Sequence, residues 1–134
     1  MKARALALAL IVAMPVIGAG SPAAGAAQDD VRPGDAARGA QVFDHSCAVC
    51  HSPIAGLHKE GPSLAGVYGR RAGSVPFFAH YRALRGLDVV WDEQTLDAWL
   101  ADPRAFAGGD TAMSVKLPDA QARADVIAYL KTLK

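Results

Sequence analysis

The sequence predicts an all-α domain whose helices are joined by long loops. Three segments, 36–46, 92–102 and 120–133, carry apolar residues at the three- and four-residue spacing of a helix, and each begins at or just after an aspartate. No segment alternates apolar and polar residues as a strand does, and no internal repeat occurs. A chain of 134 residues has room for one such domain.

The first 27 residues predict a secretory signal peptide. A basic start, Met1–Arg4, precedes a short apolar run, and small residues, Ala23–Ala27, end the stretch. An uncleaved membrane anchor is the alternative, but a span needs about 20 apolar residues, and the run here stops near Ile17, ahead of Pro22. We therefore expect a soluble exported protein, located in the periplasm of a bacterium.

The composition excludes several classes of function. Removal of residues 1–27 leaves 12 Lys and Arg against 13 Asp and Glu, so the mature chain has no excess of positive charge with which to bind nucleic acid. The two cysteines cannot form a multi-bridge disulfide scaffold. Because no second long apolar run follows the leader, we expect no stable membrane insertion after signal cleavage.

The predicted domain covers 35–134 and is preceded by a polar lead-in at 28–34, which we expect to be flexible. Asp35 is a candidate N-cap for the first helix. Gly39 and Phe43 share one face of that helix. A glycine inside a helix costs about 1 kcal/mol relative to alanine, and its presence here indicates close approach of another backbone.

Residues 52–90 contain repeated glycines and prolines, and no periodic pattern survives there. A loop of this length is uncommon inside a compact domain, unless something other than protein fills part of the core. The helix predicted at 92–102 ends before Pro103, which cannot continue it. Residues 103–118 are then predicted to be loop, ahead of the last helix.

The segment Cys47–His51 reads C-x-x-C-H, the signature of covalent c-type haem attachment. Two thiols three residues apart on one turn can form thioethers to one side of a haem, and the adjacent imidazole is then held against the iron. A thioredoxin-like redox pair would need a βαβ context, and a structural zinc site would need four ligands. A simple disulfide is the third alternative. The histidines available are His45, His51, His58 and His80.

Met113 is the only methionine outside the leader, and it lies in a glycine-rich loop. A lone methionine is more often core filler, but beside C-x-x-C-H it becomes the favoured second axial ligand. His58 or His80 would instead make a bis-histidine iron of lower potential. His45 lies too close to the motif to reach the opposite face of the iron easily.

These residues carry a resemblance to the small class I cytochromes c, which covers about residues 34–131. Its markers are Gly39, Phe43, Cys47–His51, Gly61–Gly66 (G-P-x-L-x-G), Gly69–Gly73 (G-R-x-x-G), Trp91, Met113 and Arg123–Lys131. The resemblance implies a fold in which the N- and C-terminal helices cross, with Gly39 and Phe43 packed against Val126 and Tyr129. It also implies one covalently attached haem c, wrapped by the long loops.

The resemblance implies six further residues around the haem: Pro62, Arg70, His80, Tyr81, Trp91 and Trp99. By this resemblance we expect the Pro62 carbonyl to accept a hydrogen bond from the ligating imidazole, and Arg70 and Trp91 to donate toward a propionate. Relatives carry a propionate-bonding tyrosine where this chain has His80 followed by Tyr81, and either can take that role. Trp99 replaces a buried tyrosine near the methionine ligand, and indole can donate a hydrogen bond but not accept one.

The expected function is therefore electron transfer and not enzymatic catalysis. With His51 and Met113 both bound, the iron has no open position, and one-electron exchange between Fe(III) and Fe(II) remains. We expect a monomeric carrier that shuttles electrons between periplasmic or membrane redox partners. The alternatives are a dedicated haem subunit or electron acceptor of a periplasmic dehydrogenase and, if Met113 is displaceable, a ligand-binding haem enzyme or sensor.

Overall fold

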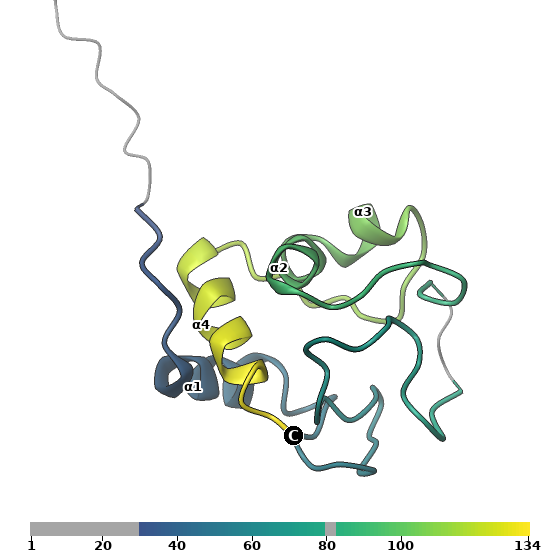
Figure 1. Ribbon diagram of the computed structural model, residues 1–134. Coiled ribbons are helices and arrows are strands. Elements are labelled where there is room, and N and C mark those ends of the chain that lie inside the picture. The colour runs from purple at the N-terminus through teal and green to yellow at the C-terminus, as the bar shows by residue number, and fades with distance from the viewer. Residues whose placement is uncertain (1–29, 80–82) are drawn as a thin grey trace, which may run out of the picture.

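The computed structural model describes residues 30–79 and 83–134, so the predicted signal peptide and the pair His80 and Tyr81 lie outside the described residues. Four helices follow one another along the chain (Figure 1): α1 (Ala36–Ser46), α2 (Glu93–Ala101), α3 (Pro103–Ala107) and α4 (Ala120–Leu130). In the described ranges the only ladder pairing is one isolated bridge between Arg71 and Val90. The all-α prediction is confirmed.

Aspartates begin the helices, as the sequence predicts. The Asp35 carboxylate accepts a hydrogen bond from the backbone N–H of Arg38, which satisfies one of the donors left free at a helix start. Asp92 and Thr95 form a reciprocal capping box at the start of α2. Asp119 accepts from two N–H groups at the start of α4. Local side-chain chemistry therefore sets where each helix begins.

The prediction of a continuous loop over 103–118 is wrong, because α3 occupies its first five residues. Asp102 ends α2 and at the same time caps α3, accepting from the N–H groups of Arg104 and Ala105. Pro103 stops α2 but suits the first position of the next helix, where its missing N–H costs nothing. The last helix is also shorter than predicted, since α4 ends at Leu130 and a turn follows.

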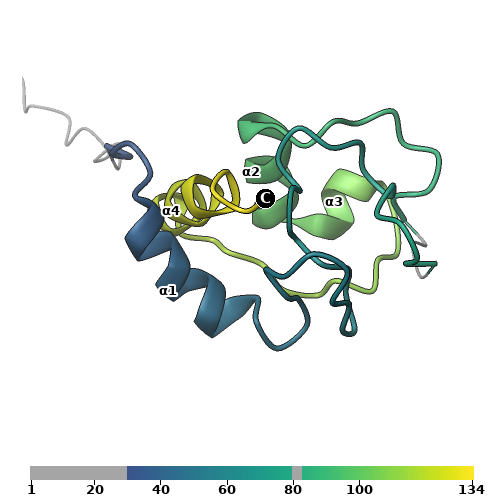
Figure 2. The same cartoon turned by 60° about the horizontal axis from the view of Figure 1, so that its bottom comes forward.

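Helices α1 and α4 cross at one end of the molecule, and both views show them side by side (Figures 1 and 2). A Cβ atom on Gly39 would lie 2.0 Å from the carbonyl oxygen of Asp125. The rings of Phe43 and Tyr129 meet with their centroids 5.3 Å apart. The predicted contact of the two helices is therefore present, and the backbone of Asp125 is what lies against the glycine.

A buried carboxylate stabilises the crossing of α1 and α4. The Asp125 side chain is 5 % exposed and lies 2.8 Å from Nε of Arg38. It also accepts hydrogen bonds from Arg38 Nη2 at 2.9 Å and from the backbone N–H of Asp35 at 2.8 Å. Just before α1, the backbone of Arg32 pairs with the side chain of Gln121 in both directions. The chain entering α1 is thus bound to α4 as well.

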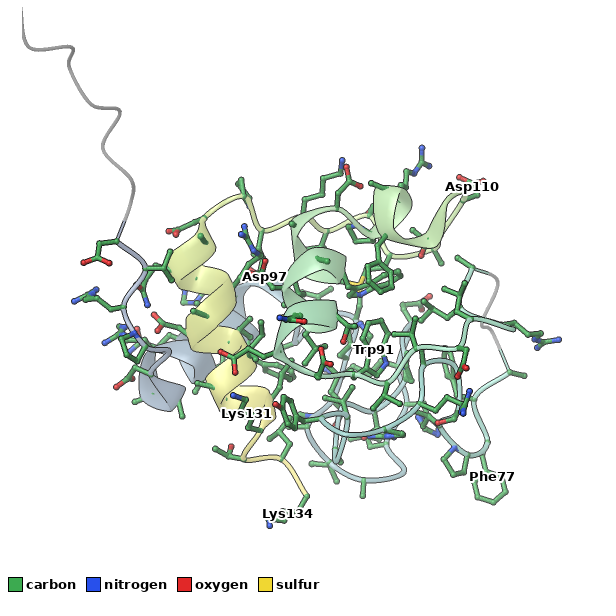
Figure 3. All side chains as sticks on the ribbon, turned by 45° about the horizontal axis from the view of Figure 1, so that its top comes forward. Phe77, Trp91, Asp97, Asp110, Lys131 and Lys134 are labelled. Atoms are coloured by element: carbon green, nitrogen blue, oxygen red, sulfur yellow. The ribbon has the colours of Figure 1, made fainter. Side chains whose placement is uncertain are left out.

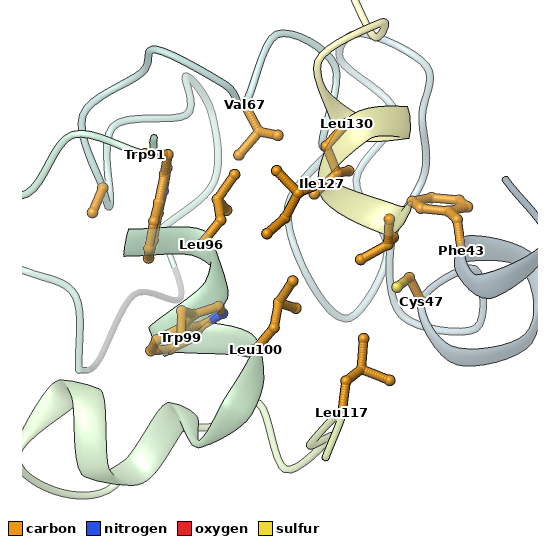
Figure 4. Close-up of a cluster of buried hydrophobic side chains, with 12 residues drawn as sticks. Phe43, Cys47, Val67, Trp91, Leu96, Trp99, Leu100, Leu117, Ile127 and Leu130 are labelled. Carbon is orange, nitrogen blue, oxygen red and sulfur yellow. The ribbon is translucent and has the colours of Figure 1, made fainter. Parts of the chain in front are cut away.

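The core lies between the helix crossing and the long loops, where apolar side chains from α1, α2 and α4 converge (Figure 4). Residues 47–79 and 83–92 contain no helix and run around the far side of this cluster. Trp91 points into the interior, whereas Phe77 stands at the outer end of a loop (Figure 3). No helix in the described part of the chain has the length and apolar content to cross a membrane.

Candidate functional site

A cavity of about 280 Å³ lies between the loops and helices α2 and α4. Most of the residues singled out in the sequence line it, although they come from segments far apart in the chain. They are Cys47, Cys50, His51, Pro62, Arg70, Trp91, Trp99 and Met113. The fold thus brings the C-x-x-C-H motif and the distant methionine to one space.

The two cysteines reach this cavity from the turn that ends α1. The N–H of Cys47 donates to the carbonyl of Phe43 at 2.8 Å, and the N–H groups of Cys50 and His51 donate back to the Cys47 carbonyl at 3.0 and 2.8 Å. This tight turn places both sulfurs on the cavity wall without joining them in a disulfide. The attachment motif is therefore presented as one compact unit.

The environment of Cys47 does not suit a redox-active thiol pair. Burial raises the pKa of the Cys47 thiol to about 11, and the neighbouring Cys50 adds to the increase. Reactive cysteines instead have a lowered pKa, because the thiolate is the nucleophile. Across residues 30–79 and 83–134, no three His, Cys, Asp or Glu side chains are grouped to hold a metal ion by themselves. The thioredoxin-like and zinc alternatives find no support here.

The His51 ring is fixed in one orientation. Its Nδ1 lies 2.7 Å from the carbonyl oxygen of Pro62, so Nδ1 carries the proton and Nε2 keeps its lone pair free for a metal. Burial lowers the pKa of His51, against the opposing effect of the Pro62 hydrogen bond, and the ring is held neutral. A neutral imidazole whose other nitrogen donates to a carbonyl is the usual arrangement of a metal-ligating histidine.

Gly61 makes room for this ring, a role that our sequence reading did not assign. A Cβ atom at Gly61 would lie 2.3 Å from Cε1 of His51. The backbone N–H of Gly61 also donates to the carbonyl of Cys50 at 2.8 Å, which ties the glycine to the motif. The Gly-Pro dipeptide is the sequence signal that pointed here, since Pro62 supplies the hydrogen bond and Gly61 the space.

Met113 reaches the cavity from the loop between α3 and α4. Its sulfur lies 3.1 Å from Nε1 of Trp99, which donates the hydrogen bond. Its backbone N–H donates to Oγ1 of Thr111 at 3.2 Å, a contact that the sequence gave no reason to expect. The thioether of Met113 therefore lies at the cavity that His51 also lines, which is a requirement for an axial ligand.

Arg70 and Trp91 also lie on the cavity wall, as the resemblance implies. The Arg70 guanidinium donates to the carbonyls of Gly66 and Ala65, which anchors its cationic head. Trp91 is buried, and its backbone is paired with that of Gly69 and Arg70. A cation and a buried indole donor beside an apolar cavity suit the carboxylates of a haem, because a buried carboxylate without partners is costly.

Six polar or charged residues also line the cavity, Ser46, Glu60, Ser63, Arg71, Thr111 and Ser114, and the remaining wall is apolar. The apolar side chains from α2 and α4 lie on the helix faces that the sequence predicts, whereas the glycine-rich loops gave no periodic signal for the others. They include Leu64, Val67, Leu96, Leu100, Val126 and Leu130. An apolar space bordered by two thiols, a pre-oriented imidazole and a thioether fits a haem that is attached through its edge. The fold and site therefore define a c-type haem protein.

The comparison with known sequences agrees. The cytochrome c family model matches residues 36–134. The chain is 38% identical over 101 residues to a cytochrome c of Euglena viridis, which covers 75% of this chain and 99% of that protein. It is 39% identical over 102 residues to a cytochrome c2 of Rhodopila globiformis, covering 76% and 96%. A cytochrome c of Chlamydomonas reinhardtii is 40% identical over 99 residues, covering 73% and 88%.

This chain belongs to the cytochrome c family, and within it to the class I cytochromes c. It carries a covalently attached c-type haem, for which Cys47 and Cys50 are the attachment residues that fit. Like the other members of the family, it transfers electrons to and from redox partners and is not an enzyme.

Proposed function

We propose that this cytochrome is a one-electron carrier whose haem iron is ligated by His51 and Met113. The observation that carries the proposal is that the free Nε2 side of the His51 ring and the Met113 sulfur belong to one cavity wall. The bound haem supplies the Fe(III)/Fe(II) couple. The protein side chains hold both ligands in place and surround the group with apolar walls.

The Pro62 carbonyl and Gly61 fix the direction and tautomer of His51, so this ligand needs no rearrangement when the charge of the site changes. The apolar walls disfavour the additional positive charge of Fe(III), and a thioether ligand acts in the same direction. Both effects favour the reduced state. We therefore expect a positive potential, suited to accepting electrons from one partner and passing them to another.

The ligand assignment is tested by the weak near-infrared absorption that a thioether bound to Fe(III) produces. The oxidised wild-type protein is expected to show this band, and Met113→Ala to lose it while keeping the covalent haem. His58→Asn is the matched control, because His58 is the competing ligand among the described residues. If the band persists in Met113→Ala, or is lost in the control, Met113 is not the ligand.

We further propose that the carrier is exported and works as a monomer in the periplasm. The support is the pattern of residues 1–27, a basic start followed by an apolar run and small residues. N-terminal sequencing of the haem-containing protein from the periplasmic fraction is expected to begin near Gln28. Recovery of the full-length chain in the membrane fraction would favour the uncleaved anchor instead.

A further inference from the structure

Phe77 is fully exposed at the outer end of the loop between Gly73 and Ala79 (Figure 3). Its backbone has a φ of 61°, in the left-handed region, which no other non-glycine residue adopts in the described ranges. A glycine would avoid the steric cost of this conformation, and a polar side chain would avoid the exposure of an aromatic ring. One residue therefore combines two unfavourable features, and the isolated fold offsets neither.

The loop beneath the ring is held in place. The carbonyl oxygen of Pro76 lies 3.1 Å from Nε2 of His58, and Nδ1 of His58 accepts a hydrogen bond from the backbone N–H of Ser63 at 3.1 Å. The ring of His58 also meets that of Phe78, with centroids 5.6 Å apart. Phe77 therefore projects from an anchored base, and its direction is set before any partner arrives.

Apolar groups and a cation accompany Phe77 at this surface. Pro76 is exposed beside it, and Leu57 is exposed on the neighbouring loop, which the histidine bond to Pro76 joins to the tip. Arg85 donates to the carbonyl of Ala79 at 3.1 Å, which holds its guanidinium near the base of the tip. The complementary surface is therefore apolar at its centre and acidic at its edge.

The distribution of charge along the chain agrees with an acidic counterpart. Residues 52–87 contain five Lys or Arg against one Glu, whereas the rest of the chain after residue 27 contains seven against twelve Asp or Glu. Arg70 lies on the cavity wall and Arg71 is paired with Asp88. Arg85 is thus a cation of this segment that is placed to meet a carboxylate of another molecule.

A protein pocket suits this tip better than a lipid surface. One ring adds little membrane affinity, since even a myristoyl chain gives only marginal, reversible binding. By contrast, one aromatic side chain that fills a pocket can carry a large share of the binding energy of a protein interface. A side chain whose direction is fixed in advance also loses less freedom on entering such a pocket.

We propose that Phe77 is an anchor for a protein redox partner, inserted into an apolar pocket whose rim carries a carboxylate facing Arg85. This proposal rests on the electron exchange with a protein partner that the carrier function requires. The next residue, Phe78, lines the haem cavity. A partner that holds Phe77 is therefore kept beside the loop that covers the haem.

The test compares the wild-type holoprotein with Phe77→Gly, which removes the ring and relieves the left-handed backbone. Disrupted, unfractionated cells of the source organism supply the partner, and oxidation of the ferrous and reduction of the ferric protein are each followed optically. In one direction the KM is expected to rise about fivefold or more with kcat unchanged, the pattern of lost binding. The rate with ferricyanide, which has no pocket, is expected to stay within twofold. Unchanged KM values in both directions would overturn the proposal.

Three further variants control for the chemistry of the contact. Phe77→Tyr keeps the ring and is expected to keep the KM within twofold of the wild type. Val31→Gly removes an exposed apolar side chain from the segment before α1 and is expected to change nothing; a rise equal to that of Phe77→Gly would contradict a specific anchor. Arg85→Glu is expected to raise the KM, because it faces the rim carboxylate with a like charge. An unchanged KM in Arg85→Glu would contradict the acidic rim.

Sedimentation with vesicles of phosphatidylglycerol and phosphatidylcholine tests the lipid alternative. The wild type and Phe77→Gly are expected to bind these vesicles equally. Binding that is lost in Phe77→Gly would make the tip a lipid anchor and overturn the proposal. If the cell extract exchanges no electrons with the wild type, the carrier function fails and this inference with it. If exchange occurs with a KM independent of Phe77, this inference fails alone.

Discussion

The Cα atom of Gly39 lies so close to the backbone of Asp125 that a Cβ there would come within 2.0 Å of the Asp125 carbonyl oxygen. The same two helices are joined by the bonds of the buried Asp125 carboxylate to Arg38. One turn of α4 thus receives both the closest backbone contact and the main ion pair of the crossing. The expected effects of Gly39→Ala and Asp125→Asn follow from this geometry, and that of Gly61→Ala follows from a similar close contact between a glycine and His51.

Gly39→Ala is expected to destabilise the protein by about 1–3 kcal/mol, the usual cost of overpacking. Helix propensity alone predicts the opposite sign, a gain of about 1 kcal/mol. Denaturant unfolding followed by circular dichroism distinguishes the two. Gln41→Ala, on the exposed side of α1, is the control and is expected to change stability by less than about 0.5 kcal/mol. If the Gly39→Ala variant is as stable as the wild type, α1 and α4 are not in backbone contact.

Asp125→Asn is expected to cost about 1.5–3 kcal/mol near neutral pH, because it removes the charge from the bonds with Arg38. Those bonds lower the pKa of Asp125 to about 2, below the value of about 3.9 for an unpaired aspartate. Since the pKa in the folded state is depressed, the stabilisation is complete above pH ~4 and is lost as the pH falls toward ~2.

The pH dependence of unfolding free energy is therefore the measurement. The difference between wild type and Asp125→Asn should stay constant from pH 7 to about 4 and shrink below it. A difference that remains constant down to pH ~2 would show that the carboxylate charge contributes nothing at this crossing.

Gly61→Ala is expected to displace the His51 ring, since the new Cβ would lie 2.3 Å from its Cε1. The bond to Pro62 prevents the ring from moving aside freely. The optical spectrum of the holoprotein should then contain a high-spin fraction that the wild type lacks. Gly109→Ala is the control, because nothing lies within 4 Å of a Cβ there. A fully low-spin Gly61→Ala protein would contradict the placement of His51.

Loss of the attachment residues is expected to unfold the chain. Most buried core side chains also line the cavity. At about 24 cal/mol per Å³, a void of about 280 Å³ costs about 7 kcal/mol, which is comparable to the 5–15 kcal/mol stability of a domain. The Cys47→Ala, Cys50→Ala double variant should therefore lack most helical circular dichroism. A haem-free chain with the native helix content would contradict this account of the core.

Electron transfer is expected to depend only weakly on ionic strength. Near the site, Val49 is 80% exposed and Val115 36%, and the neighbouring Ser46 and Ala112 carry no charge. Many surface cations are paired with carboxylates, as Lys116 is with Asp102, so the field beyond a Debye length of about 10 Å is weak. Stopped-flow reduction of ferricyanide by the ferrous protein checks this.

The Ala112→Lys variant serves as the comparison for the salt dependence. It adds one positive charge beside Met113 and should steepen the fall of the ferricyanide rate with salt. A wild-type rate that already falls steeply would indicate a strong positive field at the site, which contradicts the prediction.

Much of this fold is predictable from the sequence because local chemistry determines it. Asp35, Asp92 and Asp119 mark helix starts by their capping bonds, and the cost of a glycine at position 39 indicates a close backbone contact. The short helix α3 was missed because Pro103 signals an end and a beginning equally well. Asp102 before Pro103 was the available sign of a new helix.

Part of the candidate haem site was predictable from the sequence. The C-x-x-C-H motif and the single methionine identify the expected ligands, but contacts between distant segments leave no local pattern. Examples are the space that Gly61 leaves for His51 and the direction of the Trp99 indole toward Met113. Such contacts depend on how the loops close around the haem, which no periodicity or spacing specifies.

The most direct test of the account is an optical redox titration of the matured protein, with carbon monoxide added to the reduced form. Ligation by His51 and Met113 predicts a low-spin spectrum, a positive potential and no uptake of carbon monoxide. A high-spin or strongly negative-potential haem, or ready uptake of the gas, would contradict the carrier mechanism and point to another ligand or an open iron position.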